Sequence, residues 1–334
     1  MSGGVDSSVA AALLQEQGHD VTGVTLKLWG GASDSGCCSV ADVEDARRVA
    51  AQLGVPHYVF NLTDDFTDSV VNPYIDEHAA GHTPNPCVEC NRSIKFGRLL
   101  DRSEALGFDF LATGHHARVV STGAGAYSLR RGVDGAKDQS YVLYMLGQRE
   151  LARTRLPVGE LTKADVREHA ARLGLRTAHK PESMDVCFIT RGGREAFLAD
   201  RVPARSGVVV DTSGATLGRH AGVTAFTVGQ RRRLGVVTGE RRYVVDIDPR
   251  TATVTIGGSR ELLRNEVALR DLVFVDGAPT GSELHAQVRA HGQPIRSSLE
   301  GATVCFATPQ PRVAPGQVVA LYDGDALVGG GIAT

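Results

Sequence analysis

The sequence is poor in the features that mark membrane, disulfide-rich and fibrous proteins. Aromatic residues make up 5% of the 334 residues, with a single Trp, and only three Met occur. No apolar run approaches the ~18 residues of a membrane helix, and the opening residues lack the basic and apolar segments of an export signal. Six cysteines are too few for a disulfide scaffold. We therefore predict a cytoplasmic protein without membrane association, whose cysteines serve catalysis or metal binding.

Charge is unevenly divided along a chain of ordinary globular composition. Hydrophobic residues make up 42% and charged residues 22%, and the length suits two or three domains. The net charge of −2 hides an acidic first third, because residues 1–110 hold 7 Lys+Arg against 16 Asp+Glu. The remaining residues carry a net charge of +7. Such a basic excess suits contact with nucleic acid, and an ordinary solvated surface is the alternative.

Helix-like and strand-like segments alternate over the first two hundred residues. Apolar spacing predicts helices at Val5–Gln17 and Val40–Leu53 and strands at Asp20–Trp29 and His57–Asn61. This order is typical of a parallel sheet with helices on both faces, hence an α/β fold. From about Ser206 short β-branched runs predict strands at Gly207–Asp211, Tyr243–Asp248, Thr253–Ile256, Leu272–Val275, Glu283–Arg289, Ala302–Phe306 and Gln317–Tyr322. We predict an α/β catalytic domain at 1–200, a small central β domain at 201–257 and a C-terminal β-barrel at 258–334.

A glycine-rich turn, Ser2-Gly3-Gly4-Val5-Asp6-Ser7-Ser8, runs directly into the first predicted helix. The glycines allow close approach of a ligand, and exposed amides, small hydroxyls and the positive helix end form an anion cradle. No Lys follows the second Gly, which excludes the kinase and GTPase type of loop. The alternative is a helix cap in which Ser2 and Asp6 satisfy amides. The turn resembles that of the ATP pyrophosphatases, which release pyrophosphate and leave AMP on a substrate oxygen. That resemblance implies that Asp6 helps to hold the Mg²⁺ of the triphosphate.

The turn stands at the beginning of the sequence, where a preceding strand is expected. In phosphate-binding βα units a strand carries the loop, and Met1 leaves no residues for it. Either the start was assigned about ten residues late, which we favour, or the sheet lacks a central strand.

Three cysteines are candidates for chemistry. Cys87 and Cys90 lie in a stiff, proline-bracketed loop at residues 83–91, and Cys187 lies in Glu182–Ile189, which we predict to end a buried strand. They fit a persulfide relay, a three-cysteine iron–sulfur cluster, a zinc site completed by a histidine, or small core residues without chemistry. The remaining cysteines, to which we assign no chemistry, are Cys37, Cys38 and Cys305.

An ordered set of motifs extends over almost the whole chain. The motifs are Ser2-Gly3-Gly4-Val5-Asp6-Ser7, Asn85-Pro86-Cys87-Val88-Glu89-Cys90-Asn91, Ala112-Thr113-Gly114-His115-His116-Ala117-Arg118, Lys137-Asp138-Gln139-Ser140-Tyr141, Leu161-Thr162-Lys163, Val186-Cys187-Phe188-Ile189, Gly229-Gln230-Arg231-Arg232, Pro315-Gly316-Gln317 and Gly329-Gly330-Gly331. In these residues the chain resembles the tRNA-specific 2-thiouridylase family. The resemblance implies an N-terminal ATP-pyrophosphatase domain of the adenine nucleotide α-hydrolase-like type, followed by two small mainly-β domains.

The resemblance also implies a reaction and its residues. ATP and Mg²⁺ would adenylate O2 of the wobble uridine in tRNA, and sulfur from a persulfide-carrying protein or sulfide would displace AMP to give 2-thiouridine. By motif position Cys90 matches the nucleophile and Cys187 the persulfide carrier, and their disulfide must be reducible. The implied ATP-binding residues are Ser2, Gly3, Gly4, Val5, Asp6, Ser7, Leu26 and Gly114. The implied tRNA contacts are Asn85, Pro86, Cys87, His115, Lys137, Asp138, Gln139, Arg289, Ala290 and Gln317.

Two positions depart from the family pattern. Many members carry Asp at the position of Cys87, and most carry Tyr at the position of Ala290. Without that Asp, the site lacks a carboxylate that could act as general acid or base, which argues against a mechanism by persulfide relay alone. A third thiol instead favours a [4Fe-4S] cluster held by Cys87, Cys90 and Cys187, with the fourth iron open to sulfide. At Ala290 a stacking or phenolic contact with RNA is missing.

Simpler structural explanations exist for the predicted RNA contacts. The segment Lys137-Asp138-Gln139 also suits a capped turn, and His115 suits a satisfied buried polar residue. Arg231-Arg232-Arg233 and Arg241-Arg242 form a basic patch suited to phosphates, or a solvated face. The rival functions are another AMP-forming ligase acting on a small molecule, which needs no paired cysteines, and an RNA-binding module that consumes no ATP.

Overall fold

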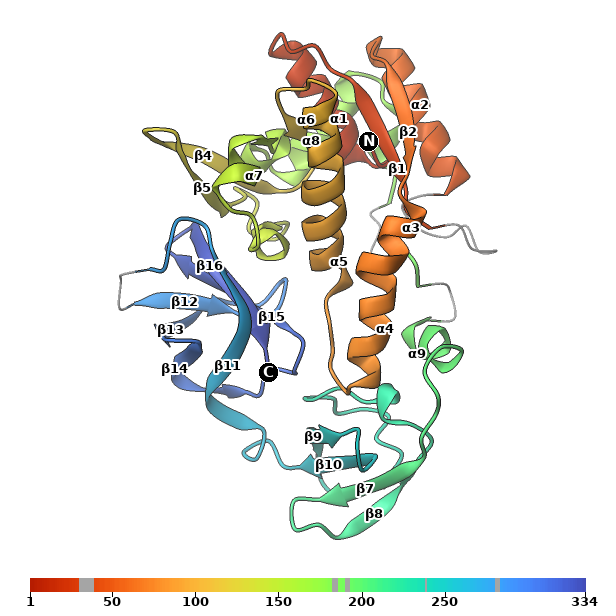
Figure 1. The fold of residues 1–334 in the computed structure, drawn as a ribbon, viewed down its shortest axis with the longest axis vertical. Coiled ribbons are helices and arrows are strands. Elements are labelled where there is room, and N and C mark those ends of the chain that lie inside the picture. Colours follow the sequence, from red (N-terminus) through yellow and green to blue (C-terminus); the bar gives the residue numbers. More distant parts are fainter. Residues whose placement is uncertain (30–38, 182–185, 190–192, 238, 280–282) are drawn as a thin grey trace.

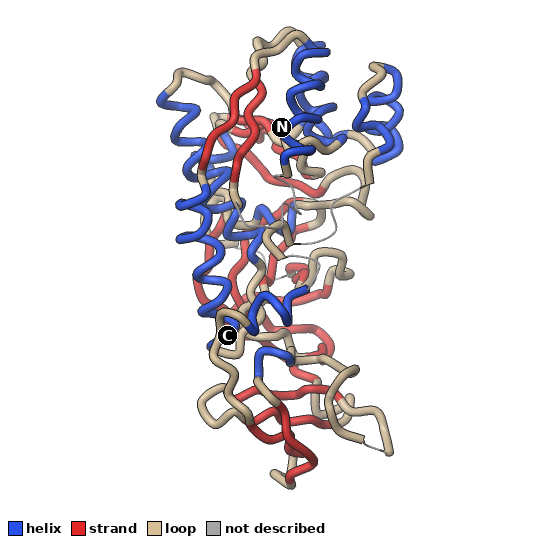
Figure 2. Tube along the Cα trace, turned by 90° about the vertical axis from the view of Figure 1, so that its right-hand side faces the viewer, coloured by secondary structure: helices blue, strands red, loops and turns tan. Residues whose placement is uncertain are grey.

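The computed structural model describes residues 1–29, 39–181, 186–189, 193–237, 239–279 and 283–334. Figure 1 shows an N-terminal part rich in helices at one end, a small sheet at the other end, and a barrel beside the long central helices. The side view in Figure 2 shows most of the helices toward the N-terminal end, with strands among them, and mainly strands toward the opposite end. Within the described ranges, no helix is both long and apolar enough to cross a membrane.

The N-terminal part combines helices with short parallel strand pairs. Its α-helices are α1 (Val5–Glu16), α2 (Val40–Leu53), α3 (Thr63–Phe66), α4 (Asn72–Ala79), α5 (Pro86–Glu89), α6 (Leu100–Ala105), α7 (Gln148–Ala152), α8 (Lys163–Arg172) and α9 (Gly193–Ala199). Two π-helical segments are η1 (Thr67–Val71) and η2 (Cys90–Leu99), and 3-10 turns are η3 (Ser140–Leu143), η4 (Pro157–Glu160), η5 (Arg176–His179) and η6 (Val223–Ala225). Its strands are β1 (Gly23–Lys27), β2 (His57–Asn61), β3 (Leu111–Ala112) and β6 (Thr154–Arg155), paired β1–β2 and β3–β6 in parallel.

Local signals in the sequence explain the helices that frame the first strands. Helix α2 begins where the Ser39 hydroxyl accepts a hydrogen bond from the Asp42 amide, and it ends at Gly54 in the left-handed conformation (φ 71°). Val9, Val49 and Val166 bring α1, α2 and α8 together in one buried cluster. The predicted helices and the parallel pairing of the first two strands are confirmed. Met1 lies against β1, because its amino group donates to the Val24 carbonyl and its carbonyl accepts from Thr25.

The C-terminal half forms two separate β structures. The small sheet runs in the order β8 (Thr216–His220), β7 (Gly207–Asp211), β10 (Thr253–Gly257) and β9 (Tyr243–Asp248). The predicted barrel is confirmed as a closed ring of β11 (Leu263–Phe274), β14 (Thr303–Pro311), β13 (Ile295–Glu300), β12 (Leu284–Gln287), β15 (Val318–Asp323) and β16 (Ala326–Ala333). Strand β11 closes it by pairing with β14 along its first half and with β16 along its second.

One hairpin of the N-terminal part belongs to the barrel sheet. Strands β4 (Ala117–Gly123) and β5 (Ala126–Arg131) pair with each other, and β5 adds to the edge of β16. Arg118 and Arg130 both bind Asp325, at 2.7 and 3.1 Å, in the turn between β15 and β16. The largest buried cluster accordingly mixes residues of both parts. The N-terminal part and the barrel are therefore joined by a continuous sheet and a common core.

Candidate active site

The glycine turn is held tightly against α2 and leaves the start of α1 open. Gly3 has φ 73°, and a Cβ there would lie 2.3 Å from the Asp42 carbonyl oxygen, so only glycine fits. Gly4 is the N-cap of α1, and no described side chain caps the helix. The Ser7 hydroxyl accepts from the Ser2 amide at 3.0 Å. The helix-cap alternative is therefore not realised, and the first amides of α1 remain available to an anion.

Asp6 is the centre of a charged group at this helix end. Lys163 Nζ donates to its two carboxylate oxygens at 2.7 and 2.8 Å, and His116 Nε2 lies 3.2 Å from Oδ1. Burial raises the pKa of Asp6, but the hydrogen bonds from His116 and Lys163 outweigh it and leave the pKa below its ordinary value. Asp6 is thus a carboxylate anion within reach of whatever binds the turn.

Two lysines that hold this site were assigned no role from the sequence. Lys163 is the first residue of α8, whose N-cap Thr162 forms a capping box with Asp165. Lys180 donates to the Gly3 carbonyl at 2.9 Å and pairs with Asp42 at 2.7 Å, and so fixes the turn to α2. For Lys163 the available signals were the capping box and its place in the motif Leu161-Thr162-Lys163. For Lys180 no local pattern marks the residue.

The other predicted ATP-binding residues lie on either side of the turn. A Cβ on Gly114 would lie 2.7 Å from the Asp6 carbonyl carbon and the Ser7 amide nitrogen, so Gly114 packs flush against the first turn of α1. Leu26 lies in β1, next to Thr25, which binds Met1. The structure therefore brings Gly114 directly onto the residues of the turn, and it places Leu26 on the adjoining strand.

Cys90 and Cys187 meet in one apolar cluster. Cys90 begins the π-helical segment η2 and is buried with Phe66 and Phe188. Cys187 and Leu26 both pack against the same cluster. Extended π-helical backbone is rare and is frequently found at functional sites. The cluster therefore joins the two predicted sulfur-transfer residues to the strand that carries a predicted adenosine contact.

The setting of Cys187 corrects one sequence prediction. Val186–Ile189 is a turn closed by the Ile189 amide on the Val186 carbonyl at 3.0 Å, and not the end of a buried strand. The apolar run is explained by Phe188, whose ring contacts Phe66 and Tyr74 at centroid distances of 5.7 and 5.3 Å. Residues 182–185, as well as Cys37 and Cys38, lie outside the described residues.

Cys87 is placed differently from the other two thiols. It is exposed, and its amide donates to the Asn85 side chain at 3.1 Å in the cap of α5. Among the described residues, no three His, Cys, Asp or Glu side chains come together as a metal-binding group. As placed, the three cysteines therefore do not fit the ligand set of an iron–sulfur cluster, and no histidine completes a zinc site with them.

His115 and Asp138, two predicted tRNA contacts, are buried. The ring of His115 binds the Thr113 hydroxyl at 2.7 Å, and burial holds the pKa of His115 well below its usual range. Asp138 accepts from the Gly132 amide at 3.0 Å and from the Ser140 hydroxyl at 2.9 Å. Both side chains thus have internal partners. Of their neighbours, Gln139 is exposed and Lys137 is half-buried.

The predicted contacts of the barrel lie in two places. Arg289 and Ala290 are exposed in the turn after β12. Gln317 instead donates through its side chain to the Thr83 carbonyl, and the Thr83 amide donates to Pro315 at 2.7 Å. Gln317 therefore fastens the barrel to the loop that leads into Asn85 and Cys87.

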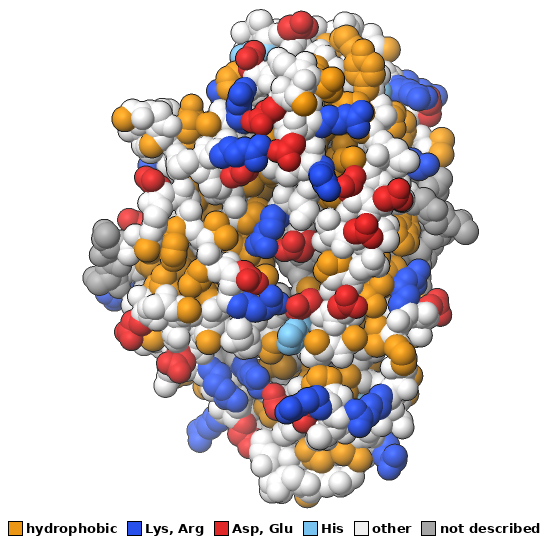
Figure 3. Space-filling model, in the orientation of Figure 1, with side chains coloured by type: hydrophobic (Ala, Val, Ile, Leu, Met, Phe, Trp, Pro, Cys, Tyr) orange, Lys and Arg blue, Asp and Glu red, His pale blue; other side chains and the backbone are white. Residues whose placement is uncertain are grey.

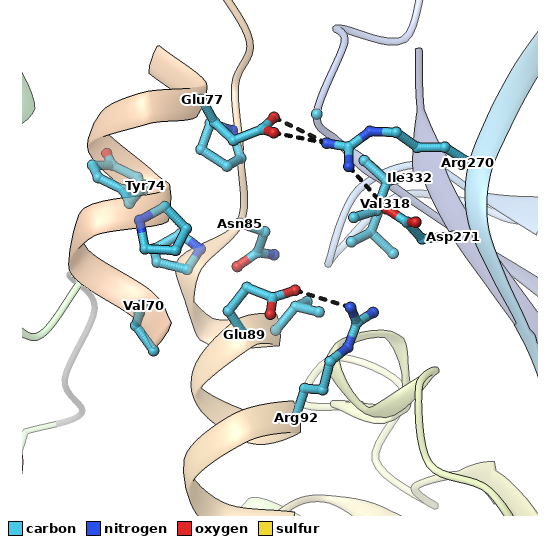
Figure 4. Close-up of a pocket in the computed structure, with 15 residues that line it drawn as sticks. Val70, Tyr74, Glu77, Asn85, Glu89, Arg92, Arg270, Asp271, Val318 and Ile332 are labelled. Carbon is cyan, nitrogen blue, oxygen red and sulfur yellow. Dashed lines mark hydrogen bonds and ion pairs between the residues drawn. The ribbon is translucent and has the colours of Figure 1, made fainter. Parts of the chain in front are cut away.

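A cavity of about 240 Å³ separates α4 and α5 from the barrel. Asn85 and Pro86 line it, together with Tyr74 and the Arg270–Glu77 ion pair, whose two hydrogen bonds measure 2.9 and 3.0 Å (Figure 4). Figure 3 shows side chains of both charges side by side along this seam. The cavity therefore has a mostly apolar lining with charged side chains among it, and it is close to the cysteine-bearing segment, although no described cysteine lines it.

The predicted basic patch forms a hollow in the central β part. Its lining includes Arg231, Arg233, Arg241 and Arg242. Arg242 pairs with Glu240, and the other three are exposed. The patch therefore presents cationic groups at the surface, as phosphate contact requires.

Comparison with known proteins gives matches over the whole chain. Residues 1–191 match the tRNA methyl transferase HUP domain, 195–258 the tRNA methyl transferase PRC-barrel domain, and 264–333 the aminomethyltransferase β-barrel domain. The tRNA-specific 2-thiouridylase MnmA of Roseiflexus castenholzii is 46% identical, with 99% of this chain and 97% of that protein covered. The proteins of the same name from Chloroflexus aggregans and Desulforamulus reducens are 48% and 44% identical, over 99% of this chain and 96% and 95% of theirs. The chain therefore belongs to the tRNA-specific 2-thiouridylase family.

Proposed function

We propose that this protein is a tRNA-uridine 2-sulfurtransferase that uses ATP to activate O2 of the wobble uridine and then places sulfur on C2. The observation that carries the proposal is the apolar cluster shared by Leu26, Cys90 and Cys187, together with the uncapped start of α1. Both features lie within residues 1–200, which supports a nucleotide site and two reactive thiols in one part of the chain. Full-length similarity to proteins named tRNA-specific 2-thiouridylase supports the same reaction.

The turn at residues 2–7 is the proposed triphosphate site. Its free helix amides and the positive end of α1 suit phosphate oxygens. Asp6 is the carboxylate that fits a Mg²⁺ ion accompanying the triphosphate, and bound there the ion would neutralise phosphate charge. Lys163 now neutralises Asp6, and its ammonium suits the polyphosphate equally well. Gly114 lets the first turn of α1 pack directly against it, because a side chain there would meet the backbone of Asp6 and Ser7.

The sulfur transfer that we propose conserves atoms and electrons. A donor protein that carries a persulfide transfers its outer sulfur to the Cys187 thiolate and keeps its own thiol. The terminal sulfur of the Cys187 persulfide then attacks C2 of the adenylated uridine and displaces AMP. The Cys90 thiolate then attacks Sγ of Cys187, which breaks the persulfide S–S bond and releases 2-thiouridine. The two cysteines are left as a disulfide, which a cellular dithiol reduces. Both thiols contact the same apolar cluster, which supports this pairing.

The geometry favours this relay over a cluster. Cys87 is exposed whereas Cys90 is buried, and the described residues contain no three-ligand group. We therefore derive no step through an iron–sulfur cluster or through zinc. Cys87 stands where the family usually has Asp. We propose that the segment Asn85-Pro86-Cys87 contacts the target base, next to the cavity that Asn85 lines.

We propose that tRNA binds across the parts of the chain, with sulfur chemistry in 1–200 and RNA contacts continuing through 201–257 and 258–334. Lys137, Gln139, Arg289 and Ala290 are placed for direct contact because they are exposed or half-buried. His115, Asp138 and Gln317 support these contacts from within, through the hydrogen bonds described above.

One assay tests the function. The protein is incubated with tRNA, ATP, Mg²⁺ and either a persulfide-carrying donor protein or sulfide, with and without oxygen, and the nucleosides are analysed. We expect 2-thiouridine, with AMP and pyrophosphate released in equal amounts. A ligase acting on a small molecule would leave tRNA unmodified, and an RNA-binding module would consume no ATP. No 2-thiouridine under either condition contradicts the proposal.

Cysteine variants separate the relay from the cluster. Cys90→Ala and Cys187→Ala are expected to abolish thiolation, whereas Cys87→Ala keeps most of it, because Cys87 lies outside the shared cluster. Cys305→Ala, in β14 of the barrel, is the matched control. Protein purified without oxygen is analysed for iron in parallel. Stoichiometric iron that is lost together with activity in Cys87→Ala would refute the relay.

A further inference from the structure

Two segments that carry proposed tRNA contacts meet through one arginine. Arg131 is the last residue of β5, and its Nη1 donates to Asp138 at 2.9 Å and to the Gln287 side-chain oxygen at 2.7 Å. Its guanidinium lies over the ring of Tyr322, 3.6 Å from the ring centroid. Arg131 therefore connects the segment at 137–139 to strand β12 of the barrel, with its charge stabilised by a carboxylate and an aromatic face.

Gln287 continues the connection to the exposed turn. It is 2% exposed, and its side-chain nitrogen donates to the carbonyls of Arg289 and Ala290, both at 2.9 Å. The side-chain oxygen accepts from Arg131 at the same time. The oxygen and the nitrogen of the Gln287 side-chain amide therefore both form hydrogen bonds. Through them a buried side chain holds the backbone of the Arg289–Ala290 turn.

The opposite end of the network is equally constrained. Asp138 accepts from the amides of Gly132 and Ser140 at 3.0 and 3.1 Å, in addition to Arg131. The Ser140 hydroxyl also lies 2.9 Å from the hydroxyl of Tyr322. Buried polar groups that lose a partner are costly, so a network in which both carboxylate oxygens of Asp138 and both ends of the Gln287 amide are paired favours one arrangement, although Arg131 Nη2 has no partner among the described residues. The distance between the segment at 137–139 and the Arg289 turn is therefore set by the network.

We propose that Arg131 and Gln287 are positioning residues for tRNA, which hold the 137–139 segment and the Arg289–Ala290 turn at the spacing at which both contact one tRNA molecule. The proposal deepens the proposed function and rests on it. Neither residue needs to touch RNA, because each acts through the backbone or carboxylate that it binds. Pre-ordering two contact segments lowers the entropic cost of binding.

The test uses a substitution that does not change charge. Gln287→Met removes the amide at nearly constant volume, and we expect the Kd for tRNA to rise about tenfold, while kcat changes less than about twofold. Because the Arg289 guanidinium would lose its position, the salt dependence of binding is expected to weaken by about one unit of slope, as in Arg289→Ala. Gln310→Met in β14, where the side chain binds Thr308, is the matched control with unchanged slope.

A double-variant cycle decides between positioning and general destabilisation. In the Arg289→Ala background, Gln287→Met is expected to raise Kd less than about twofold further, because both changes act through one turn. Arg131→Lys keeps a charge beside Asp138 but loses the planar guanidinium, so it should raise the KM for tRNA and spare kcat. Thermal unfolding of each variant shows that the fold is retained.

Several outcomes overturn the proposal. Effects of Gln287→Met and Arg289→Ala that add in full, or an unchanged Kd and salt slope for Gln287→Met, mean that the network does not position the turn. Wild-type protein that binds tRNA but forms no 2-thiouridine contradicts the proposed reaction and leaves the binding test valid. Wild-type protein that binds no tRNA contradicts both.

Discussion

Lys163→Met tests the charged group on which the nucleotide site depends. Its side chain is 11% exposed, and it binds both oxygens of Asp6, which is 31% exposed. The substitution leaves Asp6 with the His116 ring as a hydrogen-bond partner. Removing one partner of a fully buried pair costs about 3–5 kcal/mol, and an exposed pair is worth about 1 kcal/mol or less. Because Asp6 is partly solvated, we expect a loss of about 1–2 kcal/mol in the free energy of unfolding at neutral pH.

The pH dependence of stability gives a second, independent readout. The pKa of folded Asp6 lies below its ordinary value of 3.8, so the pair stabilises the fold above pH 3.8. That contribution is lost as the pH falls through the folded-state pKa. Without Lys163 the pKa of Asp6 moves upward, because the hydrogen bond and the charge of the lysine no longer lower it. The gain in stability of the wild type between acid and neutral pH should therefore shrink in Lys163→Met, as measured by denaturant unfolding across this range.

Controls isolate the pair from a general effect of losing a lysine. Lys27→Met removes an exposed lysine from β1 and should change stability by less than about 0.5 kcal/mol. A cycle with Asp6→Asn should give a coupling energy of about 1 kcal/mol. Thiolation should fall sharply in Lys163→Met, because Lys163 is proposed to bind the polyphosphate. Wild-type stability with unchanged pH dependence would refute the structural reasoning, whatever the activity.

Three further predictions concern the turn and the seams between the parts. Gly3→Ala should abolish ATP-dependent activity and cost about 2 kcal/mol or more, because its Cβ meets the α2 backbone, whereas Gly18→Ala, also at positive φ but in open space, should cost about 1 kcal/mol and spare activity. Glu77→Gln should destabilise the protein by about 1 kcal/mol through the Arg270 pair, as measured by denaturant unfolding. Tyr322→Phe should cost about 1 kcal/mol, because the hydroxyl contact with Ser140 is lost, and equal Tm values would contradict it.

Elements with both a start and a stop signal were predicted well. Helix α2 has the predicted bounds because Ser39 caps it and Gly54 ends it, and β2 follows with its predicted bounds after a short turn. Strands β7 and β9 agree for the same reason, since Gly, Asp or Pro stand beside both. These signals depend on neighbouring residues alone, so they can be recognised in a single sequence.

The strand predictions failed where glycine or aspartate lies within a strand of the barrel. Strand β16 was missed because Gly329-Gly330-Gly331 looks like a turn. A Cβ at Gly329 or Gly330 would lie 2.3 or 2.5 Å from backbone oxygens of β11 or β15, so the glycines permit close strand packing. The predicted strand Leu272–Val275 is the end of a longer β11, which bends at Asp271 with φ 53° where the register shifts. Hairpin β4–β5 was missed as well.

The candidate site was also predicted only in part from the sequence. Motif position indicated the turn at residues 2–7 and the pairing of Cys90 with Cys187, yet only the fold shows that the two cysteines share one apolar cluster. Lys163 and Lys180 were missed because a lysine among polar residues is usually a surface residue, and their carboxylate partners are more than a hundred residues away. Cys187 was predicted in a strand because apolar residues surround it in the sequence. In the structure Phe188 packs into an aromatic cluster instead.

Continuity of the barrel sheet explains why the proposed RNA contacts act together. Strand β5 ends at Arg131, and it is held on β16 by the backbone and by Asp325, which binds Arg118 and Arg130. Arg131 is therefore fixed to the barrel by strand pairing alone, independently of the side-chain hydrogen bonds of the network. Without this pairing, Gln287 would face an arginine on a separately moving part, and a network of buried hydrogen bonds would not keep one spacing. A substitution that breaks the β5–β16 edge should consequently weaken tRNA binding through both contact segments at once, although it touches neither.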